Sequence, residues 1–362
     1  MQWYQDPLFG IILVFVIIAI VGALDFIRNR IKERKRVNSL EDLKKSYEFL
    51  GIKDGVEEFL KLNKNAIPTL EFIANAYIQS GNIQEAIKIY TSILNASPST
   101  STQDKVHILY ALGVVHFQSG FLQRAKNVFL EIVKNFPRNP EALFYLLRIY
   151  EKLNEYEKAI DVVDCLQEIY EQSGNLDDTK YFETLSHNRA YLESMCIFAD
   201  EGSAFEDKVP KLEALKAIFP RLEKPILMYY RNYNLALFWQ KAQEARNIEN
   251  LLDVLWHCPK SEVPLESLTN QKIIEIYRAR EQTHISYESN KQECAKFELE
   301  TLRLLRAYSH FSVDLHFEYR CSECKGIFPL ENQRCPTCNA LLSFDVLCSV
   351  RESKDEIRYS LL

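Results

Sequence analysis

The sequence predicts a mainly α-helical protein with three parts: an N-terminal transmembrane helix, an α-solenoid of helical hairpins, and a small C-terminal β module that contains four cysteines. Three observations predict this class. They are an uncharged apolar segment near the N-terminus, a hydrophobic pattern that recurs about every 34 residues, and two C-x-x-C pairs near the C-terminus. The chain also has only 10 Gly and 12 Pro in 362 residues, which argues against a sandwich or barrel with many tight turns.

The apolar segment predicts a membrane anchor. Residues 7–24 are 18 residues without a charge, and as a helix they would span about 27 Å, close to the roughly 30 Å hydrocarbon core of a bilayer. Trp3 and Tyr4 precede the segment, where interfacial aromatic residues are expected. No Lys or Arg comes before the segment. Six basic residues follow it: Arg28, Arg30, Lys32, Arg34, Lys35 and Arg36. A cleaved signal peptide has the opposite charge order, so we expect a single-pass protein with its bulk in the cytoplasm. The basic residues set this topology and can also contact anionic headgroups.

The remaining composition excludes two classes of protein. The formal net charge of −6, from 44 basic and 50 acidic residues, argues against a general nucleic-acid-binding protein. The sequence contains no phosphate-binding glycine loop, H-E-x-x-H or G-x-S-x-G motif, so we expect that the protein is not an enzyme.

The central part contains three phased copies of one pattern. The first copy has Leu70, Ala74, Tyr77, Gly81, Ala86, Tyr90 and Pro98. The second has, at the same offsets, Leu109, Gly113, His116, Gly120, Ala125, Phe129 and Pro137, and the third has Leu143, Leu147, Tyr150, Asn154, Ala159 and Val163. This period and pattern are typical of the tetratricopeptide repeat. We expect the small residues to allow close helix approach, the glycines to end the first helix of each pair, and the prolines to stop the second.

The flanking segments extend this array with weaker signals. Residues 39–63 have the apolar spacing of a degenerate first pair, and residues 172–312 keep helical spacing but lose the signature. We expect loops at residues 175–178 and 201–210. The predicted organisation is a membrane anchor (1–27), a basic linker (28–38), repeats (39–171), degenerate hairpins (172–312), a metal-binding module (313–350) and a tail (351–362).

The two C-x-x-C pairs predict a metal site. Cys321 and Cys324 are separated by ten residues from Cys335 and Cys338, a spacing that brings four thiolates to one tetrahedral ion. Zinc and iron both suit four sulfur ligands. A thioredoxin-like redox motif lacks its βαβ context here, and a nucleic-acid-binding ribbon lacks a basic face. We expect short strands around the site, formed by Phe317, Tyr319, Ile327, Phe328, Leu341, Leu342 and Phe344.

Other candidate residues have simpler interpretations. Cys165, Cys196, Cys258 and Cys294 occur singly in helical stretches and are expected in the core, and Cys348 lies outside the C-x-x-C spacing. His116 occupies a position where the repeat takes Tyr, so a packed ring is expected. His257 next to Cys258 has no second pair to complete a metal site. Asp161 and Asp164 share a helix face that we expect to be solvated, not catalytic.

The combination of an apolar anchor, repeats and a terminal C-x-x-C…C-P-x-C ribbon resembles the lipopolysaccharide assembly protein B (YciM) family, whose last module is rubredoxin-like. The likeness runs in order along the chain and is closest at residues 146–162, 319–324 and 335–338. Of the family's functional residues, only Cys321, Cys324, Cys335 and Cys338 carry over. Lys325 and Arg334 depart from the family pattern, which has Gly and an aromatic residue at these positions.

The resemblance implies a bacterial inner-membrane adaptor. Members of the family modulate the FtsH membrane protease, promote proteolysis of the deacetylase that commits precursors to lipid A, and act with other lipopolysaccharide assembly proteins. We therefore expect a tethered scaffold whose concave surface binds a partner segment and whose metal module caps and braces the array; the residues that bind the partner stay open, and a homo-oligomer is compatible with this interpretation. Two alternatives remain: a redox- or metal-responsive sensor with the same parts, and an envelope-biogenesis scaffold with another client.

Overall fold

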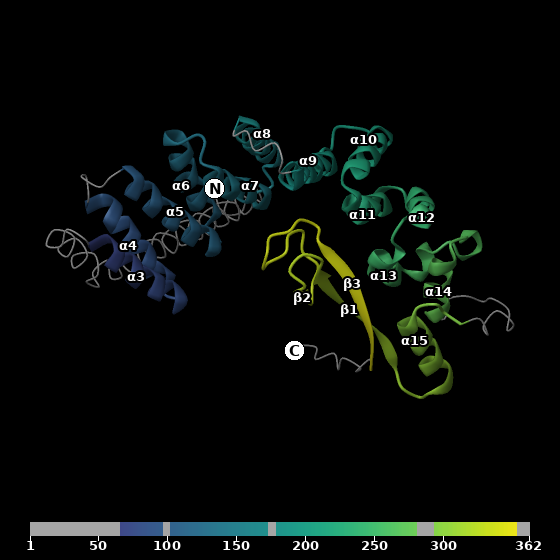
Figure 1. Ribbon diagram of the computed structural model, residues 1–362. Helices are drawn as coiled ribbons and strands as arrows, with labels where there is room; N and C mark the ends of the chain where they lie inside the picture. Colours follow the sequence, from purple (N-terminus) through teal and green to yellow (C-terminus); the bar gives the residue numbers. More distant parts are fainter. Residues whose placement is uncertain (1–65, 97–101, 173–178, 281–292, 353–362) are drawn as a thin grey trace, which may run out of the picture. The chain divides into compact units, whose positions relative to one another are not determined.

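The computed structural model of the chain describes residues 66–96, 102–172, 179–280 and 293–352 (Figure 1). The chain divides into two compact units, Met1–Tyr145 and Leu146–Leu362. The predicted membrane segment, the basic linker, residues 39–63 and Pro98 lie outside the described residues. Within the described ranges, no helix is both long and apolar enough to cross a membrane.

The first unit is built of helical hairpins, as the repeat pattern predicts. Its helices are α3 (Ala66–Gln79), α4 (Ile83–Ala96), α5 (Thr102–Gln118), α6 (Leu122–Asn135) and the start of α7 (Pro140–Lys152). The small repeat residues Ala74, Ala86 and Ala125 have no exposed surface, which confirms that they lie in the seams between helices. The equivalent residue of α8, Ala159, is equally buried. The amphipathic stripe of each helix therefore forms a core only together with its neighbours.

Phe129 on α6 contacts aromatic rings of both α5 and α7. Its ring stacks on Tyr145 with centroids 4.8 Å apart, and its edge meets Tyr110 at 6.0 Å. Gly113 makes room for the ring, because a Cβ atom there would lie 2.7 Å from Phe129 Cζ. The glycine at this repeat position thus allows the close helix approach that the sequence predicts.

The turns between paired helices share one hydrogen-bonded motif. Gly81 and Gly120 have positive φ angles of 82° and 78°, and Asn154 takes the same position with φ 59°. At each turn this residue donates its N–H to a carbonyl three residues back, and the next residue donates to a carbonyl five residues back. This is the Schellman pattern of helix ends, in which the left-handed residue is favourable for Gly and tolerable for Asn.

Replacing Gly120 with Ala is expected to reduce the free energy of unfolding by about 1 kcal/mol, because only Gly adopts this conformation without strain. The effect isolates backbone conformation, since a Cβ atom at this position would meet nothing within 4 Å. The matched variant Asn154→Gly should leave stability unchanged or increase it slightly. Urea unfolding followed by circular dichroism measures both variants, and equal stability of Gly120→Ala and the unaltered chain would contradict the expectation.

The second unit begins with long helices and continues with shorter ones. Its helices are α8 (Tyr156–Gln172), α9 (Thr179–Ala199), α10 (Phe205–Ile218), α11 (Glu223–Tyr233), α12 (Leu235–Glu244), α13 (Leu252–Trp256), α14 (Gln271–Ala279) and α15 (Phe297–Tyr308). Short 3₁₀ turns η2 (Pro220–Leu222), η3 (Ile248–Leu251), η4 (Lys260–Glu262) and η5 (Leu265–Ser267) join several of them. The predicted helical character of this region is therefore confirmed. Fully buried aromatic residues form much of its core: Tyr191, Tyr230, Tyr277 and Phe238.

The loop predicted over residues 201–210 is too long. Helix α10 starts at Phe205 and includes Pro210, so only the first few residues of that range lie outside a helix. Glu206 and Asp207 in the first turn favour a helix start at this point through the helix dipole. The buried side chain of Lys208 donates to the carbonyl of Asp200 and ties the turn down. These local contacts compensate for the backbone hydrogen bond that is missing at Pro210, which has no N–H to donate.

The C-terminal module, which we call the ribbon (residues 313–352), is a three-stranded antiparallel sheet. Strand β1 (Val313–Cys321) pairs with β2 (Ile327–Phe328) and with β3 (Phe344–Glu352), in the order β2-β1-β3. The β1–β3 register runs from Val313 opposite Glu352 to Cys321 opposite Phe344. Strands β1 and β3 are longer than the short strands expected from the sequence. Leu341 forms only an isolated bridge, and Leu342 has a left-handed φ of 43° that ends any strand there.

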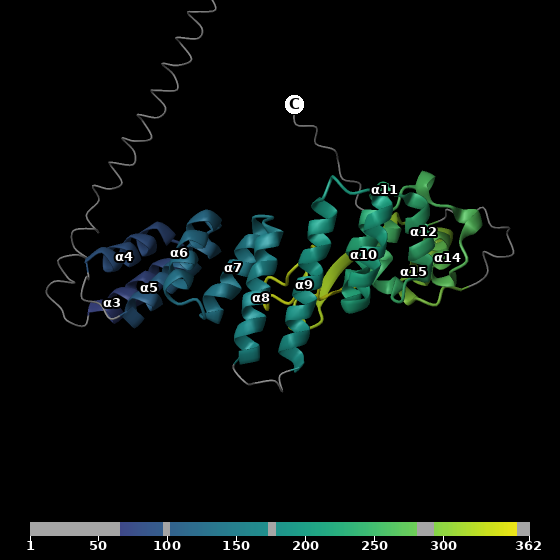
Figure 2. The same cartoon turned by 90° about the horizontal axis from the view of Figure 1, so that it is seen from above.

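Within the second unit, the helices curve around one side of the sheet (Figures 1 and 2). The sheet contacts η3 and α15, and further hydrogen bonds reach from the ribbon to α7, α9 and α13. The ribbon thus lies along the helices of its unit, as expected of a module that braces the array. A sheet of three strands has too little core of its own, so this position gives it a second apolar surface.

Candidate metal centre

Each C-x-x-C pair lies in a tight turn of the same backbone design. In the first turn, which follows β1, Lys325 donates its N–H to the Cys321 carbonyl, and Cys321 donates to the Gly326 carbonyl. In the second, Asn339 donates to Cys335, and Cys335 donates to Ala340. Lys325 and Asn339 hold equivalent places with φ angles of 62° and 60°. These two turns, here called knuckles, therefore direct their paired sulfurs in equivalent ways.

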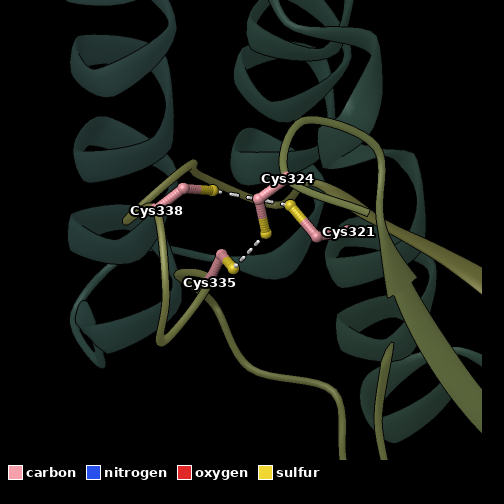
Figure 3. Close-up of side chains that lie close together, drawn as sticks. All are labelled: Cys321, Cys324, Cys335 and Cys338. Atoms are coloured by element: carbon pink, nitrogen blue, oxygen red, sulfur yellow. Dashed lines mark hydrogen bonds between the residues drawn. The ribbon is translucent and has the colours of Figure 1, made fainter. Parts of the chain in front are cut away.

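The four sulfurs of Cys321, Cys324, Cys335 and Cys338 lie within 4.8 Å of one another (Figure 3). Cys321 and Cys338 are 3.6 Å apart between Sγ atoms, as are Cys324 and Cys335. A disulfide requires about 2 Å, so these are free thiols. Four ligands at about 2.3 Å from a central ion would stand about 3.8 Å apart, which matches this spacing. The quartet could therefore hold one metal ion, and its geometry fits both zinc and iron.

The surroundings of the four cysteines give their thiols different pKa values. Burial opposes ionisation of Cys321, but hydrogen bonds with the Ser343 hydroxyl and the backbone N–H groups of Cys324 and Glu323 outweigh it and lower the pKa of this thiol to about 6. Burial, followed by hydrogen bonds with the other three thiols, raises the pKa of Cys338 to about 12. The Cys321 thiolate therefore forms easily, whereas the Cys338 thiol resists ionisation, because burial and its neighbouring thiols favour its neutral form. A cation among them removes that resistance.

Apolar side chains enclose the inner half of the quartet. Cys321 and Cys335 are fully buried and pack with Phe344, while Cys324 and Cys338 face solvent. Phe328 meets Phe344 edge to face at 5.6 Å between centroids. The expectation that apolar residues flank the site is confirmed for Tyr319, Phe328 and Phe344. Two sulfurs are thus shielded from water and oxidants, and two are accessible.

Lys224 on α11 joins the ribbon to the helices through a group of four side chains, Lys224, Asp253, Tyr319 and Glu331, which we call the clasp. Its ammonium lies 2.8 Å from Asp253 Oδ2 and 2.7 Å from Glu331 Oε2, and Tyr319 donates to the same Asp253 oxygen at 2.9 Å. Burial raises the pKa of Tyr319, with Asp253 adding to the effect, and burial also raises that of Glu331 although Lys224 opposes it. Beside this clasp, Arg221 donates to the Leu342 carbonyl at 3.2 Å.

Sequence reasoning missed these clasp residues. Asp253 did give a signal, since it is a single carboxylate inside the apolar run Leu251–Trp256. A charge in such a run is expected to meet a partner when the helix packs.

The other candidate residues are not gathered into a site. Asp164 pairs with Arg189 and Asp161 is exposed, which is consistent with a solvated face. His116 is buried against Phe121, and burial, followed by the charge of Arg124, lowers its pKa. His257 is exposed and contacts the Asp253 carbonyl at 2.7 Å.

The core placement predicted for the single cysteines is correct for two of them. Cys258 and Cys294 are buried, and burial is the largest cause that raises the pKa of each thiol to about 11. Cys165 is exposed on α8 and Cys196 is partly exposed on α9. The prediction is therefore wrong for Cys165, because it lies between the apolar residues of its helix and outside the stripe that they form.

Comparisons with known proteins agree with the repeat architecture. Sequence models of the tetratricopeptide repeat match residues 69–103 and 110–173. The chain is similar to lipopolysaccharide assembly protein B of Haemophilus influenzae, with 28% identity over 105 residues that cover 29% of this chain and 26% of that protein. It is also similar to lipopolysaccharide assembly protein B of Escherichia coli K12, with 28% identity over 114 residues that cover 31% and 29%. The chain thus aligns with little more than a quarter of the length of these curated relatives.

Solved structures include similar helical arrays. The chain superposes on MamA of Desulfovibrio magneticus with a TM-score of 0.36 and 14% identity, covering 50% of this chain and 93% of that one.

Proposed function

We propose that this chain, a tetratricopeptide-repeat protein of the lipopolysaccharide assembly protein B family, acts as an adaptor in lipopolysaccharide assembly. The observation that carries the proposal is one chain with three features: tetratricopeptide repeats, a similarity to that protein over 29–31% of this chain, and a cysteine quartet that could hold a metal ion. Stacked helical hairpins present long surfaces that suit the binding of other proteins. The proposed role is therefore binding and presentation of partners, not catalysis.

The proposal includes one zinc or iron ion bound by Cys321, Cys324, Cys335 and Cys338. When bound, such an ion supplies folding free energy, which a ribbon of about forty residues needs because its own core is small. Cys321 and Cys335 would bind it from the buried side, and Cys324 and Cys338 from the solvent side. The role of the site is then structural, since it holds the two knuckles together against the helices.

The finer proposal concerns location and partners. Residues 7–24 would cross the bacterial inner membrane once, and the basic residues from Arg28 to Arg36 would keep the repeats on the cytoplasmic side. Tethering at the membrane raises the effective concentration of the repeats near membrane-bound partners. The partners we propose are an FtsH-type protease and other lipopolysaccharide assembly proteins, with the lipid A pathway deacetylase as the client.

Depletion of the protein tests the client assignment. If the adaptor promotes proteolysis of the deacetylase, its depletion should raise the level of the deacetylase and lengthen its half-life in cells whose synthesis has been stopped. Re-expression of the unaltered chain is the control and should restore rapid turnover. An unchanged half-life would overturn the client assignment, and crosslinking in membranes followed by mass spectrometry would then identify the actual partner.

A further inference from the structure

The second knuckle is fastened to the helices of its unit on both sides of its cysteines. Gln333 and Arg334 precede Cys335 directly, and Asn339 follows Cys338 directly. Each of these three ribbon residues makes a side-chain hydrogen bond to a residue on α7 or α9. The partners are far away in sequence, so these contacts exist only when the ribbon lies against the helices.

Arg334 makes the strongest of these contacts. Its Nε donates to Glu151 Oε2 at 2.6 Å, and its Nη2 donates to Asn188 Oδ1 at 2.5 Å. The Glu151 side chain is 8% exposed and that of Arg334 is 16% exposed, so water screens this ion pair little. The Asn188 amide is itself oriented, because its Nδ2 donates to the Thr184 carbonyl at 2.7 Å. Glu151 and Asn188 thus hold the guanidinium in one position.

Two further hydrogen bonds extend this fastening. Arg148 Nη2 donates to Asn339 Oδ1 at 2.5 Å, and the Tyr191 hydroxyl donates to Gln333 Oε1 at 2.8 Å. Tyr191 is only 1% exposed, so its ring is fixed in the helical core. The knuckle is therefore bound at its entry and at its exit.

The first knuckle differs. The hydrogen bonds that residues 322–326 make in the described part of the chain all stay inside the ribbon, such as Ser322 N–H to the Ser343 carbonyl at 2.7 Å. The two halves of the quartet are therefore positioned by different parts of the protein. Contacts within the ribbon position Cys321 and Cys324, whereas Cys335 and Cys338 are held by their own knuckle and, in addition, by residues of α7 and α9.

We propose that Glu151 and Asn188 are positioning residues for the metal site, acting on Cys335 through Arg334. This inference rests on the metal binding proposed above. Residues that orient metal ligands from outside the coordination shell commonly change metal affinity 10–100-fold when they are replaced. Because linkage is reciprocal, a bound ion also strengthens the docking of the ribbon on α7 and α9 by the same factor.

The rate of zinc release tests this inference on the zinc-loaded full chain. Release into excess 4-(2-pyridylazo)resorcinol is followed by absorbance, with helical circular dichroism recorded for each variant. Glu151→Gln keeps the shape of the side chain and removes its charge, and we expect it to release zinc about tenfold faster than the unaltered chain. Asn188→Ala should change the rate in the same direction. Both variants should keep unaltered helix content.

Two controls separate positioning from general destabilisation. Glu193→Gln removes a partly exposed carboxylate of α9 that pairs with Arg189 and makes none of the ribbon contacts described above, so it should leave the release rate unchanged. Lys224→Met weakens docking through Glu331 and Asp253, neither of which hydrogen-bonds to Arg334, and should accelerate release less than Glu151→Gln does.

The possible outcomes are distinct. If Glu151→Gln and Asn188→Ala release zinc at the rate of the unaltered chain, the inference is overturned and the metal site is not. If Glu193→Gln accelerates release as much as Glu151→Gln does, the inference is overturned in the same way. An unaltered chain that binds no zinc would overturn both the metal site and this inference.

Discussion

Replacing Cys335 with Ser is expected to abolish stoichiometric metal binding and to unfold the ribbon. Cys335 begins the second knuckle and is fully buried, so a hydroxyl at this place removes a thiolate ligand and leaves a polar group in an apolar pocket. Structural zinc sites of this type contribute roughly 10–16 kcal/mol of apparent binding free energy to folding, which a small sheet cannot replace. Elemental analysis of the purified chain measures the ion, and hydrogen exchange over residues 313–352 measures the fold.

Cys348→Ser is the matched control. Cys348 lies in β3 outside the quartet, and this variant should keep one ion per chain and full protection of the ribbon. The absorbance spectrum of the unaltered protein also decides the metal, because a colourless protein with one zinc excludes the iron-based redox sensor. One ion per chain in the Cys335→Ser variant would show that the quartet is not the binding site.

The largest effect expected outside the ribbon is that of Phe129→Ala. The ring has no exposed surface and contacts both Tyr110 and Tyr145, and its loss would leave a cavity beside Gly113, which has no side chain to fill it. Truncation of a buried Phe commonly costs about 3–5 kcal/mol, so the first unit should become marginal or unfold at 37 °C. Urea unfolding measures the loss, and hydrogen exchange in α5 and α6 assigns it to the first unit.

Leu130→Ala provides the comparison for this prediction. Leu130 is the next residue of the same helix and is 40% exposed, so its truncation should cost far less than that of Phe129. Similar costs for the two variants would contradict the prediction, because the buried ring contacts of Phe129 would then add nothing beyond those of a partly exposed residue.

The part of the fold that sequence predicts well is the part with local periodicity. Ala74, Ala86 and Ala125 recur at fixed offsets because each hairpin solves the same packing problem, and the glycine turns recur for the same reason. The quartet is equally visible, since a C-x-x-C turn positions its own sulfurs through bonds between near neighbours. In both cases the physics that determines the structure acts over a few residues.

Contacts between distant segments were not predictable in this way. Arg334 lies 183 residues from Glu151, and nothing near either residue indicates the other. The length of β1 and β3 also depends on mutual pairing and on their contact with α15, not on the apolar residues near the knuckles. The start of α10 at Phe205 depends on a buried lysine that reaches back to Asp200. Each case is a tertiary contact that overrides local preference.

The sequence separation of the ribbon contacts has a consequence for biosynthesis. Arg148 and Glu151 meet partners that are 191 and 183 residues later in the chain. While the ribosome is still making the intervening helices, these early residues have no ribbon to bind, and folding of the second unit waits for residues 313–352 to emerge. The capture of a metal ion by residues 313–352 would therefore complete the folding of the unit, so a shortage of the ion would leave the helices without their ribbon and exposed to proteases.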